Sequence, residues 1–181
     1  LSPAPHVVES AQRPPPPHPP ERCPVCDTAT VKPEASVFTR CPNRDCAGRR
    51  WQLLTFFVSA LDIDGLGEKQ VSLFMDLGWV HTAAGFYDLT AEQIAEQPGF
   101  GTVSAEKLVT AIGASKEMPF GRVLVALGIE EVGGVTGRNL AQQFRSIDAL
   151  LAANAEAIEQ TPGVGPKMAA VIHEQLHDPI M

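Results

Sequence analysis

After residue 50, short apolar segments alternate with breaks marked by glycine or proline. The stretch WQLLTFFVSAL at 51–61 carries no charge and predicts a buried helix. Thr90 and Ser146 each stand directly before a helical pattern, as N-cap residues do. Pro119 separates the end of one helix from the start of a new apolar one. No strong strand-like alternation follows residue 50, so this region is predicted to be all-α.

The aromatic side chains of the first apolar segment have two possible roles. Trp51, Phe56 and Phe57 could stack on nucleic-acid bases or pack in the protein interior. We interpret all three as core residues because the surrounding segment is uniformly apolar.

A glycine-containing hairpin recurs four times along the helical region. The four segments are GLGEKQVSLF (65–74), GFGTVSAEKL (99–108), EVGGVTGRNL (131–140) and GVGPKMAAVI (163–172). The second glycine falls at 67, 101, 133 and 165, so the intervals are 34, 32 and 32 residues. Small or apolar residues follow it at fixed offsets of four and seven. A fixed period of this size indicates one repeated unit, which reads as helix, G-h-G hairpin, helix.

The chemistry of this unit suits an anion. Hairpin glycines can adopt positive φ and let another backbone approach closely. The second helix begins at once, so its free N–H groups and positive dipole end point out of the hairpin toward a phosphate oxygen. The alternative is a turn in which glycine only saves space, but four in-phase copies favour the phosphate site. The predicted DNA-contacting residues are Gly65, Gly67, Lys69, Gly99, Gly101, Gly133, Gly163, Gly165 and Lys167.

The side chains near the hairpins differ among the four copies. Lys69 and Lys167 each stand two residues after the second glycine. A helix start normally disfavours cations, so these lysines point to an anionic ligand, although each could simply face solvent. The third hairpin carries Glu130 and Glu131 instead, and Glu131 replaces the first glycine. We therefore expect the third hairpin to bind phosphate least well.

All four cysteines lie within 24 residues, in the order Cys23-x2-Cys26-x14-Cys41-x4-Cys46. Two pairs of thiolates suit a tetrahedral zinc ion, and four protein ligands leave no open position, so the site is predicted to be structural. Two disulfides, a redox CxxC motif and an iron–sulfur cluster remain as alternatives that fit the spacing and context less well. The residues between the pairs suit a small β-hairpin.

Composition and charge restrict the ways in which this chain could bind DNA. The 181 residues are 44% hydrophobic and carry a net charge of −7, which argues against a polycation that coats DNA. Residues 21–59 have a charge of +2 and residues 60–181 a charge of −9. Binding therefore requires that the acidic side chains face away from the hairpins.

The amino terminus, LSPAPHVVESAQRPPPPHPP, has neither the basic nor the apolar region of a signal peptide. Its prolines at 14–17 predict a stiff linker, and we interpret the chain as part of a longer protein. No apolar run is long enough for a membrane span, so no membrane partner is expected. The predicted domains are a linker at 1–20, a zinc finger at 21–50 and a helical array at 51–181.

No set of residues indicates catalysis within this chain. We interpret the five histidines as scattered, with neither the spacing of a catalytic triad nor an H-E-x-x-H motif, and neither a Walker motif nor a dinucleotide-binding fingerprint occurs. No catalytic residue is assigned.

The order of the motifs resembles the NAD-dependent bacterial DNA ligases. The likeness covers residues 5–178 and includes the four-cysteine knuckle, DIDGLGEKQV, DLGWVHTAAGFYDLT, GFGTVSAEKL, SKEMPFGRVLVALGIEEVG and TPGVGPKMAAVI. The opening APHVV resembles the end of that family's OB-fold domain. Each motif alone is common, but a zinc knuckle followed by four helix-hairpin-helix units is specific.

The resemblance implies the part of a nick-sealing enzyme that holds nicked duplex DNA. In that family a lysine of a K-x-D-G motif takes AMP from NAD, and sealing requires Mg²⁺. Here Asp62-Ile63-Asp64-Gly65 has aspartate where that lysine would stand, so the catalytic lysine is not in this chain. The adenylation, OB-fold and BRCT domains would then be intramolecular partners, and the protein would be cytoplasmic and associated with the bacterial nucleoid. The alternatives are a DNA glycosylase and a non-enzymatic helix-hairpin-helix module that targets DNA junctions or a repair nuclease.

Overall fold

The computed structural model describes residues 18–33 and 37–178. It divides into two compact units, residues 1–43 and 44–181. Most of the linker predicted at 1–20 therefore lies outside the described residues, and the domain limits given above stay predictions.

The described residues of the first unit form turns with little regular structure. Their β-pairing is limited to two isolated antiparallel bridges, Arg22 with Ala29 and Val31 with Arg40. The bridge between Val31 and Arg40 has two backbone hydrogen bonds of 2.8 Å each. Of the β-hairpin expected between the cysteine pairs, the described part contains only this bridge.

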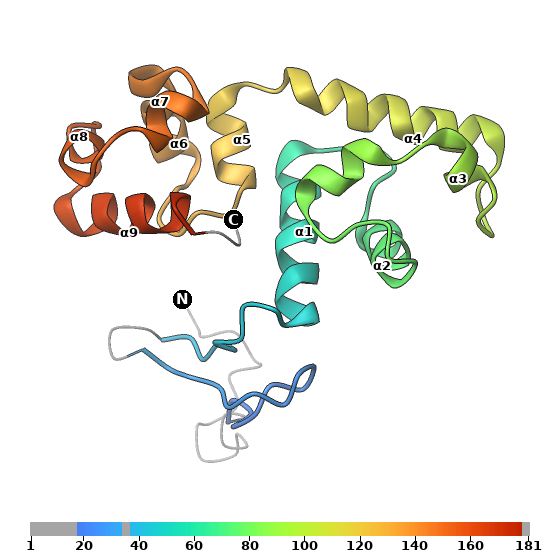
Figure 1. Ribbon diagram of the computed structural model, residues 1–181, viewed down its shortest axis with the longest axis horizontal. Coiled ribbons are helices and arrows are strands. Elements are labelled where there is room, and N and C mark those ends of the chain that lie inside the picture. Colours follow the sequence, from blue (N-terminus) through green and yellow to red (C-terminus); the bar gives the residue numbers. More distant parts are fainter. Residues whose placement is uncertain (1–17, 34–36, 179–181) are drawn as a thin grey trace, which may run out of the picture. The chain divides into compact units, whose positions relative to one another are not determined.

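The second unit is helical, as the sequence predicts. Its elements are α1 (Ala47–Leu61), α2 (Glu68–Asp76), η2 (Ala83–Asp88), α3 (Ala91–Ala95), α4 (Thr102–Ala114), η3 (Ser115–Glu117), α5 (Phe120–Ala126), α6 (Gly134–Phe144), α7 (Ile147–Leu151), α8 (Ala155–Glu159) and α9 (Pro166–Leu176) (Figure 1). Within the described part of the chain, no helix has the length and apolar character needed to cross a membrane.

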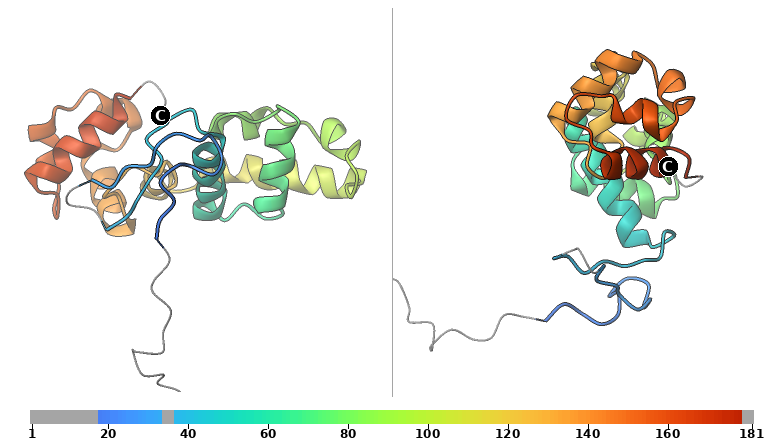
Figure 2. Two further views of the ribbon diagram at one scale, coloured as in Figure 1. Left: turned by 90° about the horizontal axis from the view of Figure 1, so that it is seen from below. Right: turned by 90° about the vertical axis from the view of Figure 1, so that its left-hand side faces the viewer.

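The four G-h-G hairpins join the predicted helix pairs. They connect α1 with α2, α3 with α4, α5 with α6, and α8 with α9, and each pair packs together. The helices drawn from orange to red, α6 to α9, gather into one group in both Figure 1 and Figure 2. The repeated unit therefore folds as four helix-hairpin-helix motifs.

Two hydrophobic cores hold the motifs in pairs. The first core draws on α1 to α4 and on Ala126 of α5, and the second on α5 to α9. Each motif contributes the apolar residue that stands seven positions after its second glycine, and these four side chains are at most 3% exposed: Phe74, Leu108, Leu140 and Ile172. The periodic positions of the sequence are thus the core positions of the fold.

Helix α1 is only partly buried. Phe57 lies in the core at 6% exposure, but Phe56 is 47% exposed, so its prediction as a core residue is wrong. Trp51 is half-buried, and its indole Nε1–H donates a hydrogen bond of 2.8 Å to Ser72 Oγ. Helix α1 has packing neighbours on one face only. Residues on its other face therefore stay exposed, although the stretch 51–61 carries no charge.

Candidate metal centre and hairpin sites

The four cysteine sulfurs form a single cluster. Cys23, Cys26, Cys41 and Cys46 place their Sγ atoms within 4.8 Å of one another. Four sulfurs around zinc at about 2.3 Å would be separated by about 3.8 Å, so small movements complete a tetrahedron. Cys23 and Cys46 are buried and the other two are half-buried, which suits a closed structural site.

A tight turn presents the first cysteine pair. The backbone N–H of Cys23 donates to Thr28 O at 2.8 Å, and Asp27 N–H donates to Cys23 O at 2.9 Å. Asp27 takes the left-handed conformation with a φ of 56°. The Arg22 guanidinium braces the turn with two hydrogen bonds to the Asp27 carboxylate, of 2.8 and 2.9 Å.

The environments of the two half-buried sulfurs differ. Hydrogen bonding to the side chain and backbone of Thr28 lowers the pKa of Cys26 to about 6. Burial, as the largest cause, raises the pKa of Cys41 to about 12. Because neighbouring thiolates repel one another, a bound divalent cation is what allows all four sulfurs to ionise.

The hairpins share one backbone conformation. The first position has positive φ in every copy: 77° at Gly65, 88° at Gly99, 82° at Gly163 and 70° at Glu131. The second glycine is extended in every copy, with φ between −89° and −128°, and is the N-cap of the following helix. The expectation that both glycines use positive φ is therefore correct only for the first position.

The second glycine leaves open space beside the helix start. A Cβ atom built at Gly101, Gly133 or Gly165 would meet no atom within 4 Å. Neither backbone conformation nor internal packing therefore requires glycine at these positions. The missing side chain instead keeps the first turn of each second helix accessible to a ligand.

Side-chain caps occur at three helix starts away from the hairpins, whereas α1 and α5 have none. The side chains of Thr90, Ser146 and Asn154 each accept a backbone N–H at the start of α3, α7 and α8. The first two of these caps confirm the sequence prediction. The helices that follow the hairpins, α2, α4, α6 and α9, have glycine N-caps, which offer no side-chain acceptor to the N–H groups of the first turn. At α2 and α4 the N–H of the N-cap glycine itself donates to Gln70 Oε1 at 3.3 Å and to Ser104 Oγ at 2.9 Å. The first-turn N–H groups of these four helices remain available to an external acceptor.

Two kinds of side chain stand two residues after the second glycine. Lys69 and Lys167 are exposed, and within the described residues neither ammonium group has an ion-pair partner. The corresponding residues of the second and third hairpins are Val103 and Val135, which are 65% and 64% exposed. The outer two hairpins thus have a cation where the inner two have an apolar side chain.

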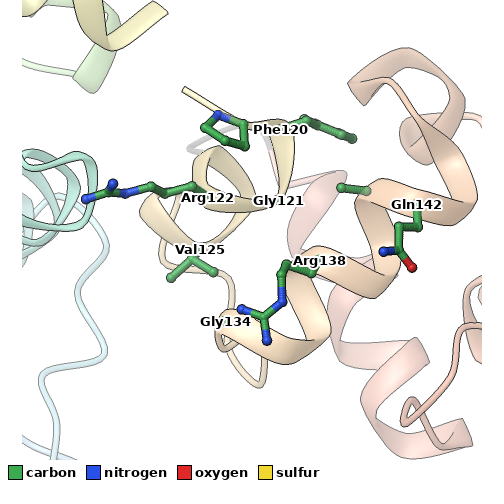
Figure 3. A pocket seen from close by; sticks show the side chains of 9 residues that line it. Phe120, Gly121, Arg122, Val125, Gly134, Arg138 and Gln142 are labelled. Carbon is green, nitrogen blue, oxygen red and sulfur yellow. The ribbon is translucent and has the colours of Figure 1, made fainter. Parts of the chain in front are cut away.

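An arginine that the sequence analysis did not select lies at the third hairpin. Arg138 places Nη1 3.6 Å from the position of a Cβ at Gly134, the first residue of α6, and Figure 3 shows the two residues together. In the same view Arg122 extends the other way and donates from Nε to Ala60 O at 2.7 Å. Both border a cavity of about 510 Å³ between α5 and α6. Arg138 stands five residues after Gly133, and the other three hairpins have no basic residue at this offset.

Comparison with known proteins identifies both parts of the chain. Residues 22–47 match the family described as NAD-dependent DNA ligase C4 zinc finger domain, and residues 122–181 match the helix-hairpin-helix motif. A DNA ligase of Thermomicrobium roseum is 41% identical over 162 residues, which is 88% of this chain. The chain is related to the DNA ligases. A DNA ligase of Roseiflexus sp. is 42% identical over 84% of the chain, and one of Gemmatimonas aurantiaca is 38% identical over 88%.

The DNA ligases that match are much longer than the matched region. The aligned residues span 23% of the Thermomicrobium roseum protein, 22% of the Roseiflexus protein and 24% of the Gemmatimonas aurantiaca protein. The similarity therefore covers a zinc-finger and helix-hairpin-helix region of these longer proteins.

Proposed function

We propose that this chain is the DNA-holding region of an NAD-dependent ligase that seals nicks in duplex DNA. The observation that carries the proposal is that all four helices after the hairpins begin at an extended glycine and have no side-chain cap, so the N–H groups of their first turn are open. Backbone phosphates of DNA would accept hydrogen bonds from these open amides. Such contacts do not read bases, so binding would be independent of sequence.

The lysines add charge to the two outer hairpins. A phosphate at the start of α2 or α9 would receive backbone hydrogen bonds and the attraction of Lys69 or Lys167. The second hairpin would rely on its backbone alone. Gly65, Gly99 and Gly163 would set the turn, while Gly67, Gly101, Gly133 and Gly165 would admit the phosphate.

The four cysteines would hold one structural zinc ion. Metal binding would supply the folding energy that so few apolar residues cannot provide around the knuckle. Zinc content of the purified protein tests this part, and the expected result is one zinc per chain. Cys41→Ser should lose the metal and disorder the knuckle while the helical content stays nearly unchanged. Iron in place of zinc would contradict the assignment.

In the complete enzyme the adenylation chemistry would lie in other domains. NAD would supply the AMP group that activates the 5′-phosphate at a nick, with Mg²⁺ assisting. The residues of this chain would hold and orient the nicked duplex. The adenylation, OB-fold and BRCT domains would be its partners within the same protein, and the enzyme would work on DNA in the cytoplasm.

Fluorescence anisotropy with labelled duplexes tests the DNA-binding part. Intact duplexes of unrelated sequence should bind with equal affinity, and the affinity should fall steeply with salt. A nicked duplex of the same sequence measures the preference for nicks. Affinity that depends on base sequence, or that is independent of salt, would overturn the proposed backbone binding.

Ligation by the full-length protein separates DNA holding from chemistry. A Lys69→Glu/Lys167→Glu variant should raise KM for nicked duplex while self-adenylation by NAD stays at the wild-type rate. Loss of adenylation in this variant would show that these residues act elsewhere in the reaction.

A further inference from the structure

The last helix carries a histidine pair that the hairpin motif does not explain. Residues 173–177 read His-Glu-Gln-Leu-His, so His173 and His177 are one helical turn apart. Their ring centroids lie 4.4 Å apart with an angle of 32° between the ring planes. The expectation that the histidines are scattered and form no H-E-x-x-H motif is therefore wrong for this pair.

A backbone contact fixes the protonation of one ring. His177 Nδ1 lies 2.8 Å from the carbonyl oxygen of His173, within hydrogen-bonding distance. A carbonyl oxygen can only accept, so Nδ1 carries the hydrogen and donates it. In the neutral ring Nε2 then has the free lone pair, as in histidines whose second nitrogen binds a metal ion.

The remaining ring nitrogens are available as ligands. Among residues 18–33 and 37–178, no hydrogen-bond partner exists for either ring nitrogen of His173 or for Nε2 of His177. His173 is half-buried and His177 is exposed, so water and ions can reach the pair. The pair also stands at the end of α9, where the helix dipole favours positive charge.

We propose that His173 and His177 bind one divalent transition-metal ion across the last turn of α9. Imidazole nitrogens select borderline ions such as Ni²⁺, Cu²⁺ and Zn²⁺, and water would fill the other coordination positions. The spacing also matches the H-E-x-x-H motif of zinc peptidases. Peptidase chemistry needs a third protein ligand, and within the described residues only the cysteine cluster gathers three or more candidate ligands. The site is thus a binding site and not a hydrolytic centre.

A bound ion would stabilise a contact between two hairpin units. Between His173 and His177, Gln175 Oε1 accepts the backbone N–H of Glu130 at 2.9 Å. That bond ties the last turn of α9 to the residues before the third hairpin. Cross-linking the turn through the two histidines would hold this contact in place.

Calorimetric titration of the zinc-loaded protein with Ni²⁺ tests the proposal. We expect one Ni²⁺ per chain beyond the structural zinc, and at a free concentration ten times Kd a rise of about 3–6 °C in melting temperature. His173→Ala and His177→Ala should each abolish both effects. His81→Ala is the matched control, because it removes an exposed histidine elsewhere and should change neither.

A spacing control separates the pair from histidine content. The double variant Glu174→His/His177→Gln keeps two histidines on the helix but places them at adjacent positions on different faces. It should bind Ni²⁺ no better than His177→Ala. Full binding by this variant, binding that survives either single substitution, or no saturable binding by the wild type would each overturn the proposed site.

Discussion

The third and fourth hairpins share a backbone and differ in surface chemistry. The first position has a φ of 70° at Glu131 and 82° at Gly163, and Gly133 and Gly165 are both extended N-caps. Yet the third hairpin exposes the side chain of Glu131 at the position where the fourth hairpin has Gly163. The same backbone therefore forms without the residue that best suits it, so forces outside the turn must impose its shape.

Those forces come from the packed positions behind each hairpin. Leu140 and Ile172 are fully buried, and each stands seven residues after the second glycine of its hairpin. Gly137 and Ala169 are also equivalent, and both are buried. Buried contacts thus determine the turn, while exposed residues at its tip are free to vary.

The largest predicted effect concerns the close approach of α5 and α6. A Cβ at Gly137 would lie 2.6 Å from Gly121 O and 3.0 Å from Val125 Cγ2. Because a backbone oxygen cannot rotate away, Gly137→Ala should lower the free energy of unfolding by about 2 kcal/mol. Urea denaturation measures the change.

Gly134→Ala in the same helix is the matched control. A Cβ there would meet only Arg138 Nη1 at 3.6 Å, an ordinary contact with a flexible side chain. This substitution should be neutral or stabilise the helix slightly. Equal losses at the two positions would mean that helix propensity, and not the contact with α5, explains the glycine.

The next prediction concerns the charge at the fourth hairpin. Lys167→Glu should weaken duplex binding about tenfold and lower the salt slope by about one, because it removes a phosphate contact and adds repulsion. Lys69→Glu should act in the same way at the first hairpin. Anisotropy titrations at several salt concentrations measure both quantities.

The reciprocal change sharpens the comparison with the third hairpin. Val135→Lys places an ammonium group where the fourth hairpin has Lys167. If the third hairpin also contacts DNA, this variant should tighten binding and steepen the salt slope. An unchanged slope in Val135→Lys and in both lysine variants would mean that the helix starts do not face the phosphates.

The sequence predicted the helix pairs and their core correctly because each repeat places its apolar residues at the same offsets from the hairpin, and these residues pack in the core. Thr90 and Ser146 were recognisable caps, since a capping side chain acts within three residues of its own position. The exposure of Phe56 depends on which face of α1 has neighbours, and the sequence does not contain that information. Arg138 was not predicted because it lies one turn inside α6, outside the hairpin pattern, and reaches back to the helix start near Gly134.

A buried hydroxyl distinguishes the turns that precede the two hairpins. Thr161 is 1% exposed, and within the described residues its Oγ1 has no hydrogen-bond partner. Ile129 occupies the equivalent position before the third hairpin and is likewise buried, at 3% exposure. Thr161→Val keeps the shape and removes the unsatisfied group, so it should raise the free energy of unfolding by about 1 kcal/mol. Thermal unfolding measures this, and a loss of stability would show that the hydroxyl is hydrogen-bonded, for example to a buried water.

The smallest predicted effect tests the left-handed residue of the third hairpin. Glu131 holds a φ of 70°, which costs a non-glycine residue about 1 kcal/mol, while glycine loses more chain entropy on folding. The two terms nearly cancel, so Glu131→Gly should raise the free energy of unfolding by only about 0.5 kcal/mol. It also removes a negative charge beside the open helix start, so duplex binding should stay unchanged or tighten. Glu131→Gln separates the terms, because it removes the charge and keeps the backbone cost. Weaker DNA binding in Glu131→Gly would mean that the glutamate itself contributes to the interface, and the third hairpin would then differ from the fourth in function and not only in surface charge.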